Sequence, residues 1–338
     1  MDGGREKADG RVPVVVVTGY LGAGKTTFVN RMLAGADGRR YAVVVNEFGD
    51  IGIDGSLIES GAEELIELAS GCVCCVVRGD LIRTLRALLG RASALDGIVI
   101  ETTGLANPGP VIQTFFADQI LQAQCRLDSV ITLVDAVHMN DRLDDSPDAA
   151  DQIMLADLIV LNKISDSAAD PDQLEVALRR LNPFAPIVRT DRCAVDLSDI
   201  FHRCGFELER IESRLAALPD NDDGHGHDDP AAHIAETGIG SLSMVCDAPL
   251  DAQRLEAWLR ELLAVRGVDI LRTKGVINVG GEDRKLVVQA VNMMLEGDFT
   301  GAWGENEARR SKLVFIGRNL DHQALRAGFL AAAAQPVH

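Results

Sequence analysis

Short apolar runs alternate with longer amphipathic stretches through the first two thirds of the chain. The apolar runs are rich in β-branched residues and apolar on both faces, which is typical of strands buried in a parallel sheet. They lie at residues 12–18, 41–46, 96–102, 128–136, 157–163 and 186–190. Between them, sequences such as KTTFVNRMLAG, RGDLIRTLRALLGRA and DQLEVALRRL have the apolar spacing of helices. This alternation predicts a doubly wound α/β domain with a mostly parallel sheet.

The composition changes at about Leu218, just before the stretch PDNDDGHGHDDPAAH. This stretch has almost nothing apolar to bury and predicts an exposed linker. Beyond it, a strand and helix pattern restarts in SLSMVC, RLEAWLRELLAV, VDILRTKGVINV, KLVVQAV, KLVFIG and HQALRAGFL. We therefore expect the α/β domain over residues 1–217, an acidic, His-containing linker over 218–237, and a smaller α+β domain with a mostly antiparallel sheet over 238–338.

The chain carries a large negative charge. Its 338 residues include 33 Lys and Arg against 51 Asp and Glu, a formal net charge of −18. This charge repels nucleic-acid phosphates and anionic membrane surfaces, so we expect neither as a partner. The N-terminal MDGGREKADGR mixes acids and bases ahead of a short apolar run and is not a signal peptide, and no apolar stretch approaches membrane-spanning length. The sequence predicts a cytoplasmic protein.

The first apolar run leads directly into GYLGAGKT at residues 19–26, a complete phosphate-binding loop between a predicted strand and a predicted helix. Its glycines let successive backbone N–H groups point at the β-phosphate, and Lys25 reaches the β- and γ-phosphate oxygens. Thr26 supplies a hydroxyl for Mg²⁺, and Thr27 lies where the positive helix end meets the α-phosphate. A plain glycine-rich turn is the alternative. The nucleotide-binding residues predicted here are Gly19, Gly22, Ala23, Gly24, Lys25, Thr26 and Thr27.

Further nucleotide contacts are expected where two other strands end. GIVIETTG places Glu101 after an apolar strand, where it would hold Mg²⁺ through water, and Gly104 where it approaches a γ-phosphate. Glu101 could instead be a helix-capping or solvent-facing acid. NEFGDIGID at 46–54 lies where nucleotide-sensing switch loops usually occur, and Asp50 either joins the Mg²⁺ shell or lies in a solvated turn. The predicted catalytic residues are Lys25, Thr26, Glu101 and Asp50.

Asn162 and Lys163, at the end of another apolar strand, begin an NKxD guanine-reading element. In that element the Asp carboxylate accepts from two guanine N–H groups, but here Ser165 has its place and Asp166 follows one residue later. Charge-assisted hydrogen bonds contribute roughly 1.5–3 kcal/mol each, so losing this carboxylate is expected to relax the guanine preference by more than about tenfold. GTP remains the favoured nucleotide.

Three of the seven cysteines crowd into GCVCC, at Cys72, Cys74 and Cys75. The motif lies in a predicted loop between the strand ELIELA and a helix that begins near Arg78. Adjacent cysteines do not suit a disulfide framework, so metal or redox chemistry in a reducing compartment fits better. Three thiolates at this spacing can converge on Zn²⁺ or Co²⁺ and leave a fourth position for exchange. Glu47, a His, water or a group of a recipient protein would fill it; a redox pair or inert core cysteines are the alternatives.

The remaining cysteines and the linker histidines carry weaker signals. The isolated cysteines stand in apolar or mixed stretches and are predicted to be small buried hydrophobes. They are Cys125, Cys193, Cys204 and Cys246. His225 and His227 lie among the aspartates of the linker, where they would bind metal weakly or belong to a merely solvated acidic segment.

In this order, GYLGAGKTT, NEFGDIGID, GCVCC, ETTGLANP and LNKIS resemble the CobW family of metal-handling GTPases over nearly the whole chain. RTKGVINV, VVQAV and RRSKLVFIGRNLD are similar to that family's C-terminal domain. The resemblance implies a slowly hydrolysing, GTP-dependent metallochaperone that holds zinc or cobalt on Cys72, Cys74 and Cys75 and delivers it to a client protein or cofactor pathway. It also implies phosphate and Mg²⁺ contacts from Lys25, Thr26, Thr27, Glu101 and Gly104.

Two other functions compete with this interpretation. A metal buffer or sensor would bind nucleotide without meaningful turnover. A small-molecule kinase would share the phosphate loop, but the sequence shows no obvious lid segment with the arginine cluster that such phosphoryl transfer needs. We expect instead that the γ-phosphate orders the loops around Asp50 and Gly104 and so reshapes the CVCC segment, which lies between them in the chain.

Overall fold

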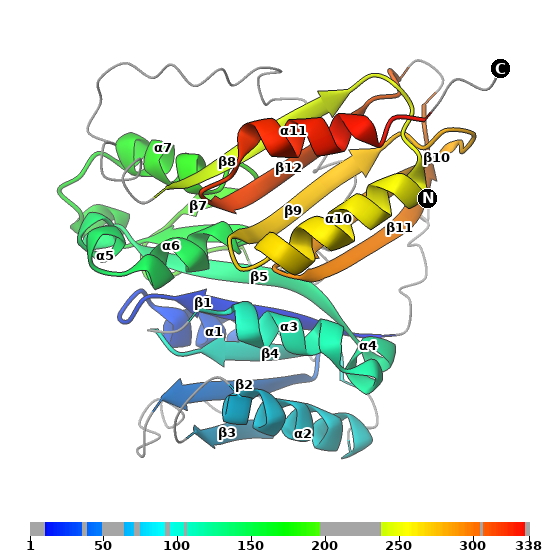
Figure 1. The fold of residues 1–338 in the computed structure, drawn as a ribbon. Helices are drawn as coiled ribbons and strands as arrows, with labels where there is room; N and C mark the ends of the chain where they lie inside the picture. Colours follow the sequence, from blue (N-terminus) through cyan, green and yellow to red (C-terminus); the bar gives the residue numbers. More distant parts are fainter. Residues whose placement is uncertain are drawn as a thin grey trace, which may run out of the picture. The chain divides into compact units, whose positions relative to one another are not determined.

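The computed structural model describes residues 11–35, 39–48, 64–70, 75–91, 95–104, 107–196, 238–304 and 307–334. These residues form two β-sheets in two compact units (Figure 1). Each sheet has its own buried apolar core, so each unit is described by itself. None of the helices in the described ranges combines the length and the apolar composition that a membrane span needs.

The first sheet has seven strands in the order β3-β2-β4-β1-β5-β6-β7, all paired in parallel. Its strands are β1 (Val12–Gly19), β2 (Tyr41–Phe48), β3 (Glu64–Ser70), β4 (Gly97–Thr102), β5 (Cys125–Asp135), β6 (Leu158–Asn162) and β7 (Ile187–Arg189). Parallel neighbours need crossover connections, and helices supply most of them. These are α1 (Lys25–Ala34), α2 (Cys75–Arg91), α3 (Gly109–Ala117), α4 (Gln119–Gln124), α5 (Met139–Asp145), α6 (Pro147–Met154) and α7 (Pro171–Leu181), with a 3₁₀ turn η2 (Ile164–Asp166).

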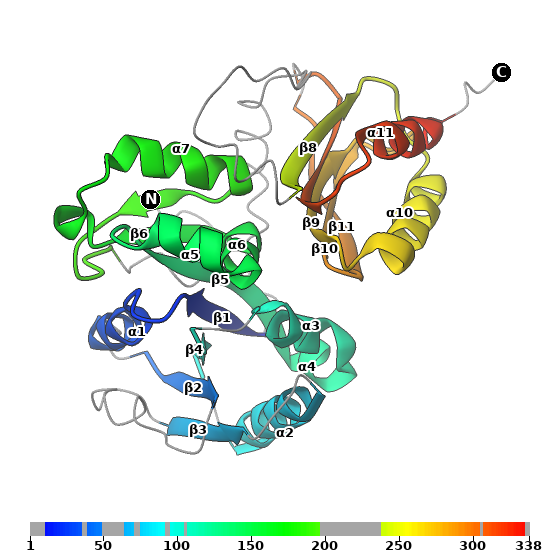
Figure 2. The ribbon, with the colours of Figure 1, turned by 60° about the vertical axis from the view of Figure 1, so that its left-hand side comes forward.

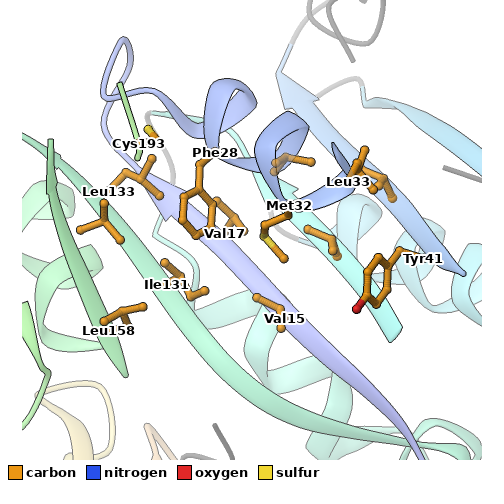
Figure 3. Packing of buried hydrophobic residues seen from close by; sticks show 14 of the residues in the cluster. Val15, Val17, Phe28, Met32, Leu33, Tyr41, Ile131, Leu133, Leu158 and Cys193 are labelled. Carbon is orange, nitrogen blue, oxygen red and sulfur yellow. The ribbon is translucent and has the colours of Figure 1, made fainter. Parts of the chain in front are cut away.

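Helices cover both faces of this sheet, with α1 on one side and α2, α3 and α4 on the other (Figure 2). Strand β1 is central, and its residues 14–17 are fully buried because both of its faces are covered. Val15 and Val17 belong to the cluster on the α1 side, where Phe28 and Met32 of α1 pack (Figure 3). This packing fixes α1, and the turn that precedes it, against the end of β1.

The second sheet has five strands in the order β11-β10-β9-β12-β8, paired antiparallel. Its elements are β8 (Ile239–Cys246), α10 (Ala252–Arg266), β9 (Ile270–Ile277), β10 (Arg284–Val291), β11 (Met294–Ala302), β12 (Ser311–Arg318) and α11 (His322–Ala331). Both helices lie on one face of the sheet (Figure 2). Trp258 of α10 stands edge-on to Phe315, with ring centroids 6.1 Å apart. Gly328 of α11 leaves room for this indole, because a Cβ there would lie 2.1 Å from Trp258 Nε1.

The structure confirms the predicted fold class, a parallel α/β unit followed by a smaller α+β unit. Every predicted strand is present, including ELIELA as β3. The helix expected to begin near Arg78 begins at Cys75 instead. The sequence conceals this first turn because Val76, Val77 and Gly79 all have low helix propensity. The predicted linker at 218–237 lies outside the described residues.

Candidate nucleotide and metal site

Strand β1 ends at Gly19 and α1 begins at Lys25, so the predicted phosphate loop is the turn between them. Gly24, directly before α1, has a φ of 106°, and no side chain of the described residues caps this helix. A Cβ on Gly24 would lie 2.8 Å from Asn162 Nδ2 and 3.1 Å from Cys193 Sγ. Conformation and contact both require glycine here. The turn leads into a helix N-terminus, whose first backbone N–H groups are suited to bind a phosphate.

The other loop residues surround the same turn. Lys25 Nζ donates to the Tyr20 carbonyl at 3.3 Å, across the turn. Ala23 is buried and its backbone N–H also donates to the Tyr20 carbonyl, at 3.1 Å. Gly22 and Thr27 are exposed. The predicted phosphate contacts are thus gathered at one helix N-terminus.

Helix α1 and strand β4 bring Thr26 and Glu101 together. The Thr26 hydroxyl donates to Glu101 Oε1 at 2.8 Å, and Glu101 is 4% exposed. Glu101 lies opposite Val17 of β1 in the parallel register, so the sheet fixes the carboxylate beside the loop. Hydroxyl and carboxylate oxygens are groups that bind Mg²⁺ directly or through its waters. The pair therefore fits the magnesium ion of a bound nucleotide.

Gly104 brings the segment after β4 close against the phosphate loop. A Cβ at this position would lie 2.5 Å from the backbone nitrogen of Leu21 and 2.7 Å from its Cα, so a larger residue would displace the loop. Thr102 strengthens the same junction, because its hydroxyl donates to Thr18 Oγ1 at 2.9 Å. The ends of β1 and β4 and the loop form one edge.

Asn162 joins the phosphate loop to two further strand ends. Its amide nitrogen donates to the Ala23 carbonyl at 3.0 Å, and its Oδ1 accepts from the backbone N–H of Cys193 at 3.0 Å. Lys163 has a left-handed φ of 63°, and its Nζ donates to Asp135 Oδ2 at 2.8 Å. The predicted base-reading residues therefore stand beside the phosphate loop.

Asp135, at the end of β5, is the centre of a small charged group. Its Oδ2 also lies 3.0 Å from His138 Nδ1. Burial by itself would raise the pKa of Asp135, but hydrogen bonds from Lys163 and His138 lower this pKa overall. The carboxylate stays ionised and holds Lys163 in place.

Ser165, in the position of the motif's aspartate, contacts Asp191 in the turn after β7. The Ser165 backbone N–H donates to Asp191 Oδ1 at 2.9 Å, and its hydroxyl donates to Oδ2 at 2.6 Å. These hydrogen bonds lower the pKa of the exposed Asp191 carboxyl. The turn continues through Arg192 and Cys193, which have left-handed φ values of 50° and 57°.

The isolated cysteines are buried, as predicted, wherever the structure describes them. Cys193 Sγ donates to the Gly24 carbonyl at 3.4 Å, and burial raises the pKa of this thiol to about 11. Burial also raises the pKa of the Cys125 thiol to about 12. Cys246 is buried in the C-terminal unit, and Cys204 lies outside the described residues.

Most predicted metal ligands lie outside the described residues. These are Asp50, Cys72, Cys74, His225 and His227. Glu47 lies in β2 opposite Ala69 of β3, β3 ends at Ser70, and Cys75 begins α2. Among the described side chains, no group of three or more His, Cys, Asp and Glu could hold a metal ion. Strand β3 therefore runs beside the strand that contains Glu47, and the GCVCC motif follows its carboxyl end.

Sequence reasoning missed two carboxylates at this edge of the sheet. Asp135 ends β5 and Asp191 follows β7. Glu101 was predicted from the same kind of position, near the end of a strand. The same signal could have found both. Their partners, Lys163 and Ser165, both lie in the turn after β6, and this proximity depends on the strand order.

A glycine loop between a central parallel strand and a helix, with an acid on the neighbouring strand, defines a P-loop nucleotide-binding protein. The chain belongs to the CobW family. Residues 13–189 match the CobW/HypB/UreG nucleotide-binding domain, and residues 239–333 match the cobalamin synthesis protein cobW C-terminal domain. The family resemblance of the sequence motifs is thereby confirmed.

Named relatives cover nearly the whole chain. The zinc chaperone YjiA of Escherichia coli (strain K12) is 35% identical over 326 residues, which is 94% of this chain and 98% of that protein. The zinc-regulated GTPase metalloprotein activator 1 of Schizosaccharomyces pombe is 40% identical over 344 residues, 91% of this chain and 83% of that protein.

Solved structures show the same fold. The crystal structure of Zn(II)-bound YjiA GTPase from E. coli has a TM-score of 0.72 at 28% identity, and the match covers 96% of this chain and 99% of that chain. A Zn(II)-bound triple mutant of YjiA, with one Glu and two Cys replaced by Ala, has the same TM-score of 0.72. The family of this chain therefore includes GTPases and zinc chaperones.

Proposed function

We propose that this protein binds and slowly hydrolyses GTP, and that the nucleotide state controls its grip on zinc or cobalt at Cys72, Cys74 and Cys75. The ion would then pass to a metal-requiring client. The names of its relatives, zinc chaperone and zinc-regulated GTPase metalloprotein activator, support this proposal. The phosphate loop also supports the proposal, because it leads into a helix N-terminus that is suited to bind an anion although the chain has a formal charge of −18.

Four described residues of the site have a part in the hydrolysis we propose. The ammonium group of Lys25, which bridges the turn to the Tyr20 carbonyl, would bind the β- and γ-phosphate oxygens. Thr26 and Glu101 would hold the magnesium ion, which neutralises phosphate charge when bound. Gly104 would admit the γ-phosphate beside Leu21, where a side chain has no room. Slow turnover suits such a protein, because one GTP would be hydrolysed for each metal ion transferred.

The observation that carries the coupling is the register between β2 and β4. Glu101 lies opposite Val45 of β2, so Glu47 is two residues further along the neighbouring strand. With about 4.8 Å between strands and about 3.3 Å of rise per residue, the Cα atoms of Glu47 and Glu101 lie about 8 Å apart. The proposed magnesium and transition-metal ligands therefore belong to adjacent strands.

Strand β3 extends this arrangement toward the cysteines. Phe48 of β2 lies opposite Ser70, the last residue of β3, and the GCVCC motif follows directly. The segment after Phe48 and the cysteine segment thus leave neighbouring strand ends. If the γ-phosphate orders the first segment, the position of Glu47 relative to the thiolates changes, and with it the affinity for the ion. An open fourth ligand position would let a client's ligand enter.

The proposed cysteine site is tested by zinc affinity in the presence of Mg²⁺ and a non-hydrolysable GTP analogue. Competition with a chromophoric chelator should show zinc binding at least about tenfold weaker in Cys72→Ser and in Cys74→Ser, because each removes one thiolate ligand. Cys246→Ser is the matched control, since that thiol is buried in the C-terminal unit. Wild-type zinc affinity in both motif variants would contradict the proposed site.

A further inference from the structure

The base-reading edge of the site contains a carboxylate that the NKxD pattern does not predict. Ser165 stands where that pattern has Asp, and both oxygens of Asp191 lie within hydrogen-bond distance of Ser165, at 2.9 Å from its nitrogen and 2.6 Å from its hydroxyl. We propose that Asp191 supplies the guanine-reading carboxylate, so that serine and aspartate have exchanged positions between the two turns. This inference rests on the proposed binding of GTP.

The Asp191 turn is held firmly against the rest of the site. Asn162 binds the phosphate loop through the Ala23 carbonyl and the Asp191 turn through the backbone N–H of Cys193, each at 3.0 Å. The Cys193 thiol donates to the Gly24 carbonyl at 3.4 Å, which links the Asp191 turn directly to the phosphate loop. Phosphate loop, Lys163 turn and Asp191 turn therefore form one connected unit. A base positioned by its phosphates would meet the carboxylate at a fixed place.

The chemistry of Asp191 suits this role. Two hydrogen bonds from Ser165 lower the pKa of the carboxyl, so it is charged at neutral pH. A carboxylate has about four lone-pair sites, and Ser165 occupies two of them. The remaining sites can accept from guanine N1–H and the guanine 2-amino group. Adenine offers no N–H group at either position, so a charged acceptor here selects guanine.

A substitution that exchanges acceptor for donor tests this assignment. Asp191→Asn should weaken GDP binding at least about tenfold and strengthen binding of xanthosine diphosphate at least about tenfold, because the amide donates to the C2 carbonyl of xanthine. Asp166→Asn is the matched control in the neighbouring 3₁₀ turn and should bind both nucleotides as the wild type does. Nucleotide affinities are measured with Mg²⁺ and without transition metal, so that metal binding at the cysteine motif cannot affect them.

The exchange itself is tested by reversing it. Asp191→Ser alone should lose the preference for GDP over inosine diphosphate, which lacks the 2-amino group, and Ser165→Asp combined with Asp191→Ser should restore it. A wild-type nucleotide preference in Asp191→Asn, or the switch to xanthosine diphosphate in Asp166→Asn, would overturn the assignment alone. A wild-type protein that binds no GDP would overturn the proposed function as well.

Discussion

Thr26 and Glu101 form the contact on which the hydrolysis we propose most depends. Glu101→Gln keeps the size of the side chain but removes the charge that would hold Mg²⁺ beside the Thr26 hydroxyl, 2.8 Å away. We expect GTP hydrolysis at least about tenfold slower, and a higher Mg²⁺ concentration for half-maximal rate. Steady-state phosphate release across a Mg²⁺ titration measures both effects.

Glu256→Gln is the matched control for this substitution. Glu256 is an exposed glutamate of α10 that pairs with Arg260 at 2.8 Å, and exposed pairs of this kind contribute little. The Glu256→Gln variant should hydrolyse GTP at the wild-type rate. Equal, measurable rates in Glu101→Gln and the wild type would refute the role of Glu101. No measurable hydrolysis by the wild type would instead favour a nucleotide-binding metal buffer.

Gly104 allows a sharper test of geometry. Gly104→Ala would put a Cβ 2.5 Å from the Leu21 nitrogen, so the phosphate loop must move. We expect GDP to bind at least about tenfold more weakly, because the loop N–H groups then lose their alignment with the phosphates. Gly90→Ala in α2 places its Cβ in open space and should bind GDP normally. Isothermal titration of both variants decides; unchanged binding in Gly104→Ala would show that the loop adapts freely.

Single-residue chemistry could be predicted from the sequence where one local motif carries it. Gly24, Lys25 and Thr26 follow from one short pattern, and the structure gathers them at one helix N-terminus. The partnership of Ser165 with Asp191 could not be predicted, because these residues are separated by a whole helix and strand and meet only through the order of β6 and β7.

At the scale of elements, β-strands that are apolar on both faces were the strongest signal. All such strands of the parallel sheet form, because burial on both sides demands continuous apolar sequence. Weakly patterned elements escaped the sequence analysis. Helix α5 (MNDRLDD) is short and mostly polar, α3 (GPVIQTFFA) is largely buried and lacks a polar stripe, and β11 (MLEGDFTGA) contains two glycines.

Asp118 links helices α2 and α4. It caps α4 by accepting from the backbone N–H groups of Ile120 and Leu121 at 3.1 and 3.0 Å, and it pairs with Arg86 of α2. Asp118→Asn keeps a good cap but removes the charge on this pair. We expect a loss of about 1 kcal/mol in the free energy of unfolding at pH 7.

The pH dependence of this loss has a definite sign. Burial would raise the pKa of Asp118, but the hydrogen bond from Arg86 and those from the backbone lower this pKa overall. A folded pKa below the unfolded value of about 3.9 gives stabilisation that is complete above that value and lost as pH falls through the folded pKa. Urea unfolding between pH 7 and pH 3 should therefore show the two proteins converging at the acid end. A difference of the same size at pH 3 and at pH 7 would mean that charge is not what Asn removes.

For the molecule as a whole, the first family match ends before the predicted linker and the second begins after it. One covers residues 13–189 and the other residues 239–333. We propose the corresponding boundaries, with a nucleotide-binding domain over 1–217, a linker over 218–237 and a C-terminal domain over 238–338. The large negative charge of −18 would favour a basic docking patch on the client.

In the proposed function, nucleotide and transition metal bind to coupled sites on adjacent strands. The direct measurement is the equilibrium affinity for Zn²⁺ and Co²⁺ of the wild-type protein, once with Mg²⁺ and a non-hydrolysable GTP analogue and once with Mg²⁺ and GDP. We predict a difference of at least about tenfold between the two nucleotide states, roughly 1.4 kcal/mol of coupling. Equal metal affinities in the two states would contradict nucleotide-gated metal handling.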